Sequence, residues 1–394
     1  MLIAEVVFWV LFALIIYSYL GYGLIMLLLS FFRTTAGTDE VMEETSLPEV
    51  TLFITAYNEI SHVHDKIRNS LEINYPKDKL KHIWITDGSD DGTPEVLREY
   101  PEVQVYHEPE RRGKIAAMNR GMQFVNTPIV VFSDGNTMLS RDSVKEIVRL
   151  FGNPKVGCVA GEKRIISREA DAAAGSGEGI YWKYESALKR IEAKVHSVVG
   201  AAGELFAIRT ELFQPVEPDT LLDDFVISLR IAMSGYIIGY SPRAYATEVA
   251  SANVAEELKR KVRIAAGGIQ AVSRLRGLLN PFRLGMLSFQ YLSHKVSRWI
   301  IVPLALLLIL PVNFLLAAGN GIFSPDVYTI FFWMQLAFYA LVLFGRIFEN
   351  RRLYLKVLFV PYYVFVMNLS CYLGFFRYIK GRQPVVWERA ERGE

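Results

Sequence analysis

The stretch ITDGSDDGT, residues 85–93, ends a short apolar run on an Asp-Gly turn, and FSDGN, residues 132–136, repeats this arrangement further along the chain. Open α/β sheets bind their ligands at the carboxyl ends of the strands. Two apolar strands that both end on carboxylates therefore predict a site for a metal-bound phosphate at one edge of such a sheet.

Strand and helix patterns alternate around these two motifs. We expect strands at 49–56, 82–86, 103–107 and 128–132, and helices at 59–71, 114–125 and 143–151. This alternation is typical of a mostly parallel sheet with crossover helices. Further along the chain the patterns predict a mobile loop over 169–179, helices over 181–195 and 223–235, and a short strand or turn over 203–209.

Long apolar runs flank this block on both sides. Hydrophobic residues make up 52% of the 394-residue chain, and uncharged runs cover 299–318, 327–345 and 357–376, while 2–32 has only Glu5. Each run is near the ~20 residues that a helix needs to cross a bilayer. Buried core helices are the alternative, but we predict a multi-pass integral membrane protein. The last run leaves two options open, a full span or a broken, re-entrant segment.

The first run has no basic leader and no small-residue cleavage pattern, so we expect a retained anchor rather than a signal peptide. Basic residues favour cytoplasmic loops. Arg33 follows the first run, the 319–326 loop has no Lys or Arg, and the 346–356 loop has four. This distribution predicts an outside N-terminus and a cytoplasmic soluble domain.

Residues 259–298 contain nine Lys or Arg and no acid. Next to a membrane span, such a stretch is expected to lie on an anionic lipid surface rather than on nucleic acid. Within it, we expect residues 280–295 to form one interfacial helix whose apolar face carries Phe282, Met286, Phe289 and Leu292.

These patterns predict the following organisation: an anchor over 1–33, a linker over 34–47, a catalytic domain over 48–255, basic amphipathic interface helices over 256–298, transmembrane segments over 299–376 and a tail over 377–394.

Several polar motifs are candidates for chemistry. TAYNE, residues 55–59, could bind a base or ribose, or could simply cap a helix. Lys114 opens a helix, where a cation is unfavourable unless an anion lies there too. Asp223 and Asp224 open another helix, either as caps or as a general base with raised proton affinity. The histidines and the two cysteines show no metal or disulfide spacing.

Together these motifs resemble the inverting, membrane-embedded family 2 glycosyltransferases, which have a GT-A fold and include cellulose, chitin, hyaluronan and poly-N-acetylglucosamine synthases. The resemblance implies a Rossmann-like, mostly parallel α/β domain with transmembrane helices. It implies Asp224 as catalytic base and Mg²⁺ or Mn²⁺ held at Asp134 and Asn136. The implied donor-binding residues are Thr55, Ala56, Tyr57, Glu59, Asp87, Lys114, Asp134 and Arg263, and the implied acceptor-side residues are Gly203, Phe206 and Asp223.

Two departures from the family pattern are present. Asn136 stands where the metal motif has its second acid, and Arg260-Lys-Val-Arg263-Ile264 replaces the Gln-x-x-Arg-Trp of processive synthases. The missing Trp favours short products over long processive synthesis.

The expected activity is transfer of a sugar from a nucleotide donor, with UDP as the expected nucleotide. The acceptor would be a carbohydrate or lipid-linked molecule at the cytoplasmic membrane face, for cell-surface or extracellular glycan synthesis. The expected partners are donor, acceptor and membrane lipids, without nucleic acid. The alternatives are a single-addition transferase that acts on a polyprenyl-linked acceptor and a non-catalytic, nucleotide-sensing membrane subunit.

Overall fold

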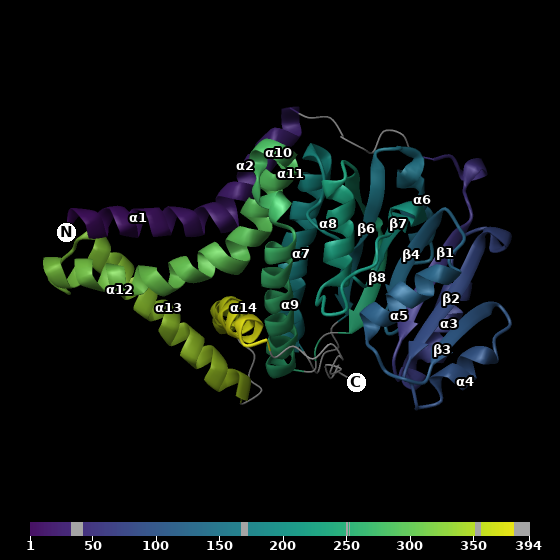
Figure 1. Ribbon diagram of the computed structural model, residues 1–394. Helices are drawn as coiled ribbons and strands as arrows, with labels where there is room; N and C mark the ends of the chain where they lie inside the picture. The colour runs from purple at the N-terminus through teal and green to yellow at the C-terminus, as the bar shows by residue number, and fades with distance from the viewer. Residues whose placement is uncertain (33–41, 167–171, 250, 252, 351–355, 382–394) are drawn as a thin grey trace.

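The computed structural model describes residues 1–32, 42–166, 172–249, 251, 253–350 and 356–381. An α/β domain lies on one side of the molecule and a group of long apolar helices on the other (Figure 1). Most of the expected 34–47 linker falls outside the described residues.

The domain is built on one eight-stranded sheet with the order β3-β2-β1-β4-β7-β6-β8-β5. The strands are β1 (Val50–Ala56), β2 (Leu80–Asp87), β3 (Val103–Glu108), β4 (Ile129–Asp134), β5 (Met138–Leu139), β6 (Val156–Ile166), β7 (Phe206–Arg209) and β8 (Ile237–Val249).

The sheet has a parallel half and a mixed half. Strands β3, β2, β1 and β4 are mutually parallel, which confirms the four strands predicted upstream. Strand β7 runs antiparallel to both β4 and β6, while β6 and β8 pair in parallel and β5 closes the edge antiparallel to β8. The sequence patterns did not predict β6 or β8. Both contain strand-disfavouring residues, including Gly157, Gly161 and Pro242, and their pairing has irregular register at two points.

Helices cover both faces of the sheet, because successive strand side chains point to opposite sides. Phe53 of β1 packs into a core with α5 (Lys114–Gly121) and α8 (Asp223–Met233). Leu52 and Ile54 pack on the other face, against α3 (Ile60–Leu71), α4 (Thr93–Arg98) and α6 (Ser143–Val148). Strands buried on both faces read as continuous apolar runs, which is why β1 and β4 were visible in the sequence.

Helix α7 (Ala172–Val195) is longer than predicted. The loop expected over 169–179 is wrong for 172–179, which are helical, and the rest of that stretch lies outside the described residues. Small residues and glycines suggested a loop, but α7 packs between β6, β8, α2 and α14, so tertiary contacts override the weak local propensity.

Three helical segments are long and apolar enough to cross a membrane within the part of the chain that is described: Leu2–Phe32, Met286–Asn320 and Val327–Phe348. The first contains α1 (Leu2–Ile16), η1 (Tyr17–Gly21) and α2 (Tyr22–Phe32). The second contains α11 (Met286–Tyr291), η9 (Leu292–Ile301) and α12 (Val302–Asn320), and the third lies in α13 (Val327–Asn350). Helix α14 (Lys356–Ile379) is one continuous helix, so the last apolar run is not broken at Pro361.

The predicted single interfacial helix over 280–295 is wrong. Helix α10 (Pro281–Leu284) ends at Gly285, whose φ of 53° interrupts the helix before α11 begins. Phe282 is 100% exposed, whereas the ring of Phe289 lies 6.0 Å from that of Tyr22 in α2. The two rings therefore do not share one apolar face.

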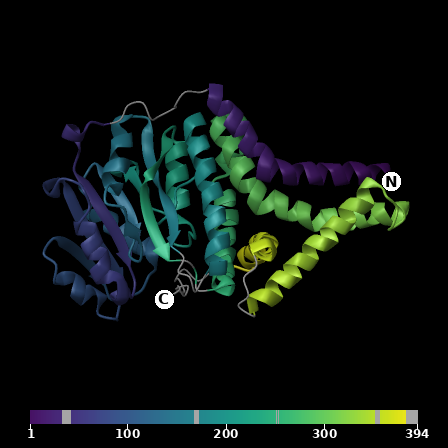
Figure 2. The ribbon, with the colours of Figure 1, turned by 180° about the vertical axis from the view of Figure 1, so that it is seen from behind.

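Helix α9 (Val254–Arg274) joins the sheet domain to the apolar helices, and Figures 1 and 2 both show it between them. Glycines make the contacts close. A Cβ on Gly267 would lie 2.7 Å from Leu222 Cγ, and one on Gly268 would lie 2.6 Å from the Trp299 ring. A Cβ on Gly374 of α14 would lie 2.8 Å from the Ala266 backbone nitrogen. Helix α9 is thus in van der Waals contact with neighbours on several sides.

Short 3-10 turns complete the described chain at Glu44–Ser46, Lys77–Lys79, Met122–Phe124, Arg149–Gly152, Thr210–Leu212 and Arg276–Leu279.

Gly268→Ala should destabilise the protein, because the new methyl group overlaps the Trp299 ring. Overpacking of this kind costs about 1–3 kcal/mol, which should lower the melting temperature measured in detergent. Gly23→Ala is the matched control, since a Cβ there meets nothing within 4 Å. Equal melting temperatures for the two variants would contradict the close packing of α9 on η9.

Candidate active site

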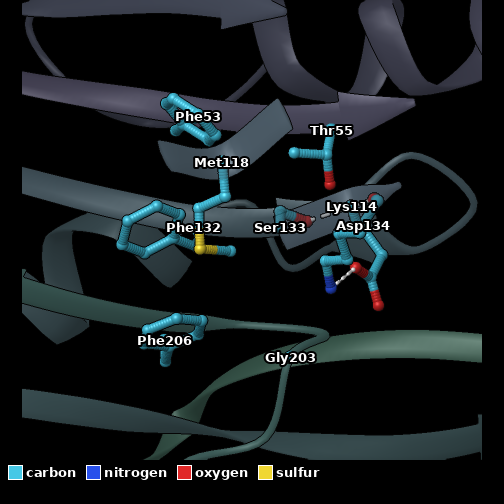
Figure 3. Close-up of a pocket in the computed structure, with 9 residues that line it drawn as sticks. All are labelled: Phe53, Thr55, Lys114, Met118, Phe132, Ser133, Asp134, Gly203 and Phe206. Atoms are coloured by element: carbon cyan, nitrogen blue, oxygen red, sulfur yellow. Dashed lines mark hydrogen bonds and ion pairs between the residues drawn. The ribbon is translucent and has the colours of Figure 1, made fainter. Parts of the chain in front are cut away.

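Three strands end at the same edge of the sheet and bring the predicted acids together. Thr55 of β1 is paired in register with Asp134 of β4, and Asp87 ends the neighbouring β2. A small pocket opens at this edge, and Figure 3 shows polar side chains at one end of it and aromatic side chains at the other. Its lining consists of Phe53, Thr55, Lys114, Met118, Phe132, Ser133, Asp134, Gly203 and Phe206.

Asp87 positions the loop that leads into α5. Its Oδ2 accepts hydrogen bonds from the backbone N–H groups of Arg112, at 2.9 Å, and Gly113, at 2.6 Å. Burial raises the pKa of Asp87, although these two N–H groups oppose the shift. Gly113 has a φ of 93°, a conformation that favours glycine. The carboxylate therefore sets where α5 begins, and with it the position of Lys114.

Lys114 lies among several carboxylates. Its Nζ donates a hydrogen bond to Asp134 Oδ1 at 2.8 Å, drawn in Figure 3, and lies 3.5 Å from Asp223 Oδ2. Burial disfavours the ammonium, but the charges of Asp134 and Asp223 outweigh it and raise the pKa of Lys114. Burial also raises the pKa of Asp134, although Lys114 opposes that shift. Lys114 thus stays charged at the site.

Asp223 and Asp224 occupy the first turn of α8, where the positive end of the helix favours acids. Asp223 is 3% exposed, and its Oδ2 accepts no hydrogen bond from the described residues. Burial, followed by the charge of Asp223, raises the pKa of Asp224 to about 7. An aspartate with this pKa can accept a proton near neutral pH.

Gly203 keeps the space above these groups open. A Cβ at this position would lie 3.4 Å from Lys114 Nζ and 3.5 Å from Asp224 Oδ2. Any side chain would therefore fill the space beside both groups. The next residue, Glu204, forms an ion pair with Lys163 of β6, and its charge adds to the rise in the pKa of both Asp134 and Asp224.

Residues at the ends of β1 and β2 form the opposite side of the site. Tyr57 has the guanidinium of Arg111 stacked 3.6 Å from its ring centroid. Asn58, with a φ of 53°, donates a hydrogen bond to Asp90 Oδ1 at 2.8 Å. The TAYNE segment and the DGSDDG turn are therefore joined to each other. Ala56 ends β1 and Glu59 precedes α3, so both lie at this edge.

The two remaining predicted residues, Arg263 and Phe206, lie at the border of the site rather than among its acids. Arg263, on α9, is close enough to the acids that Asp223, Asp134 and Asp224 all raise its pKa, although burial and Arg260 lower it overall. Phe206 is buried in the core, where its ring stacks 4.7 Å from that of Phe132, and it lines the apolar end of the pocket.

Asp134 and Asn136 supply hard oxygen ligands suited to Mg²⁺ or Mn²⁺. No group of three or more His, Cys, Asp or Glu with metal-binding geometry exists among the described residues. Hard cations of this kind are commonly held by one or two protein ligands together with substrate phosphates. This donor set therefore fits a cation that binds with a diphosphate rather than one held by protein alone.

Two functional candidates were not found in the sequence. Glu204 follows Gly203 directly, but its ion pair with Lys163 joins segments far apart in the chain. Lys66 is fully buried in α3, and its Nζ donates hydrogen bonds to Ser133 Oγ and the Thr137 carbonyl, both at 2.7 Å. Burial lowers the pKa of Lys66 to about 7. In the sequence Lys66 is indistinguishable from a solvated helix lysine.

Comparison with known proteins identifies relatives of this chain. The poly-β-1,6-N-acetyl-D-glucosamine synthase of Staphylococcus epidermidis is 23% identical over 374 residues, which cover 89% of each chain. The enzyme of the same name from Staphylococcus aureus (strain COL) is 27% identical over 236 residues, 58% of this chain and 56% of that one.

The solved structure of the mannosyltransferase PcManGT from Pyrobaculum calidifontis, in complex with GDP-Man and Mn²⁺, superposes with a TM-score of 0.73 at 22% identity. The match covers 96% of this chain and 100% of that one, and it shows the same GT-A fold.

A family model described as glycosyltransferase like family 2 matches residues 48–267, more than half of the chain. The protein therefore belongs to glycosyltransferase family 2 and is a glycosyltransferase.

Proposed function

We propose that this protein transfers a sugar from a UDP-linked donor to a carbohydrate hydroxyl at the cytoplasmic face of a membrane, with inversion at the anomeric carbon. The observation that carries the proposal is the position of Asp224. Its pKa is about 7, and it lies beside the space kept open by Gly203, close to the Lys114 ammonium. A base and a cation on one small space suit the attack of a hydroxyl on a sugar diphosphate.

In this reaction the acceptor oxygen bonds to the anomeric carbon as the bond from that carbon to the diphosphate breaks. Asp224 takes the proton of the attacking hydroxyl. The leaving nucleoside diphosphate gains negative charge, which Lys114 and Arg263 stabilise from fixed positions. Preorganised charge of this kind is usually the largest contribution to rate enhancement. Asp223, whose Oδ2 accepts no hydrogen bond from the described residues, orients the acceptor hydroxyl towards Asp224.

Asp134 and Asn136 would hold a divalent cation, which would supply further positive charge for the diphosphate. The Mn²⁺ in the mannosyltransferase structure supports this assignment. Asn136 contributes no charge, so we expect the protein to bind the cation weakly without donor. Lys66 acts as a positioning residue, because its hydrogen bonds to Ser133 and Thr137 flank Asp134.

We assign the nucleoside to the side of the site formed by Thr55, Ala56, Tyr57, Glu59 and Asp87. The stacked Arg111 and Tyr57 offer a flat cationic surface, which suits a base and its adjoining phosphate.

The likeness to poly-β-1,6-N-acetyl-D-glucosamine synthases over most of both chains supports a role in glycan synthesis. We assign the three candidate spans to the membrane, with the α/β domain on the cytoplasmic side and lipids around the apolar helices, since Lys and Arg concentrate on that side. The second candidate function is the addition of a single sugar to a lipid-linked acceptor. Ile264 favours it, because processive synthases have Trp at this position.

Asp224→Asn should abolish most transfer, because the amide retains the shape of the side chain but cannot take the proton. Loss of a general base costs about 10²- to 10⁴-fold in rate. Transfer is measured with radiolabelled UDP-N-acetylglucosamine and GDP-mannose, and donor binding by calorimetry. Asp65→Asn, an exposed position on α3, is the control. Wild-type transfer rates in Asp224→Asn would exclude Asp224 as the base.

The pH dependence of kcat/KM should report the proton on Asp224. A pKa of about 7 means that the carboxylate is largely protonated at pH 6 and inactive as a base. The value of kcat/KM should therefore fall as the pH drops through 7. Asp223→Asn removes a neighbouring negative charge and lowers the pKa of Asp224, so this acid limb should move to lower pH. An unmoved limb would contradict electrostatic coupling between the two acids.

Chelation should stop transfer, and an excess of Mg²⁺ or Mn²⁺ should restore it. Asn136→Asp adds a second carboxylate beside Asp134 and should lower the cation concentration needed for half-maximal rate. Asn126→Asp controls for added charge, because Asn126 is exposed before the start of β4, at the end opposite Asp134, and its Oδ1 already accepts a hydrogen bond from Lys81. Unchanged turnover in EDTA would rule out the proposed cation.

A further inference from the structure

Aromatic and charged side chains of α7 form a cluster with Lys163 of β6, next to the candidate active site. Trp182 and Lys189 are seven residues apart, about two helical turns, and so share one face of α7. Lys189 Nζ lies 6.0 Å from the Trp182 ring centroid, and Lys163 Nζ lies 5.3 Å from it. Trp182 is only partly buried.

Lys163 connects this cluster to the active site. Its ammonium forms ion pairs with Glu204 and with Glu248 of β8. Glu204 directly follows Gly203, the residue that borders Asp224. Lys163 and Glu204 therefore link the Trp182 ring to the loop that borders the proposed base. Helix α7 also contacts α2 and α14. Helix α7 thus lies between the sheet and the long apolar helices, as Figure 2 shows.

Lys189 is the unusual member of the cluster. It is 7% exposed, its ammonium makes no hydrogen bond or ion pair with the described residues, and the ring centroids of Trp182 and Tyr240 lie 6.0 and 5.9 Å from its Nζ. A buried charge without a hydrogen-bond partner is costly. Burial lowers the pKa of Lys189 accordingly. Such a group is suited to a ligand oxygen that completes its hydrogen bonds.

The neighbouring charges indicate which ligand fits. A phosphate beside Lys163 would meet the carboxylates of Glu204 and Glu248, which already bind that ammonium. A sugar hydroxyl avoids this repulsion, because it can accept from an ammonium and donate to a carboxylate. The exposed part of the indole offers apolar surface for the C–H groups of a sugar ring. Aromatic and polar groups that converge in this way characterise small-ligand sites.

We propose that Trp182 and Lys189 form a subsite for a sugar ring of the acceptor. The indole packs against one face of the ring, and the Lys189 ammonium donates a hydrogen bond to a ring hydroxyl. The inference rests on the proposed function, and it narrows the acceptor to a molecule that already carries carbohydrate. Helix α7 thereby supplies the aromatic surface that α9 lacks at Ile264.

The test compares Trp182→Ala and Lys189→Met with Lys183→Met, an exposed position on the same helix. The probes are a β-1,6-linked N-acetylglucosamine tetrasaccharide and mannotetraose, and binding to the full-length protein in detergent with UDP and Mn²⁺ is measured by calorimetry. We expect both cluster variants to weaken binding of at least one saccharide by about tenfold, as loss of a charged hydrogen bond predicts. Lys183→Met should bind like the wild type.

A melting curve separates binding from a structural role. Lys189→Met removes a buried, unbonded charge at nearly constant volume, so the melting temperature should stay equal or rise. A clear fall in melting temperature would show that the ammonium serves the fold and would overturn the proposal. Wild-type protein that binds neither saccharide, or cluster variants that bind both normally, would overturn it too.

Two further measurements separate this proposal from its alternatives. Undecaprenyl phosphate in the same assay tests for a phosphate site, and a tenfold loss confined to that lipid would overturn the sugar subsite. Hydrolysis of the donor in the absence of acceptor reports the proposed function itself. Donor hydrolysis should be equal in the wild type, Trp182→Ala and Lys189→Met. Its absence in the wild type would count against the catalytic proposal rather than against the subsite.

Discussion

The candidate active site depends on the ion pairs that the Lys114 ammonium forms with Asp134 and Asp223. Asp134, Asp223, Asp224 and Glu204 bring four carboxylates to one partly enclosed place, and their mutual repulsion would be severe without a cation among them. Lys114 hydrogen-bonds to one and contacts another. Its own position follows from Asp87, which holds the loop before α5. The strand ends, the α5 start and the α8 start are thus arranged around one charge.

Local signals explain which parts of this site were predictable. Asp87 and Asp134 end apolar strands, and Lys114 and Asp224 open helices. In each case the few residues on either side are enough to predict the strand end or the helix start. The resemblance to a known family then assigned them roles. The local sequence does not predict the ion pair of Glu204 or the parallel pairing of β6 with β8, because both depend on contacts between segments far apart in the chain. The helical start of α7 is the same kind of case, a weak local pattern decided by packing.

The two halves of the sheet have different tasks. The parallel half ends in the polar groups assigned to the donor, and its strands β1, β2 and β4 are buried on both faces. In the mixed half, Lys163 of β6 forms a buried ion pair with Glu248 of β8 and lies beside the Trp182 ring of α7. Strand β7 joins the halves, and the loop before it carries Gly203 and Glu204. A single short segment therefore separates the side assigned to the nucleotide from the side assigned to the sugar.

The glycines that bring α9 so close to its neighbours have a mechanical consequence. Ala265 and Ala266 of α9 contact Gly374 of α14, and Gly268 contacts Trp299. Arg263 lies on the same helix, two to five residues before them. Interiors packed this closely transmit displacement rather than absorb it. A change in bilayer thickness that tilts the second candidate span, which carries Trp299, would therefore move α9 and its Arg263 or open the contact with Gly268. The thickness of the surrounding lipid would then alter the position of a guanidinium that interacts electrostatically with Asp223, Asp134 and Asp224.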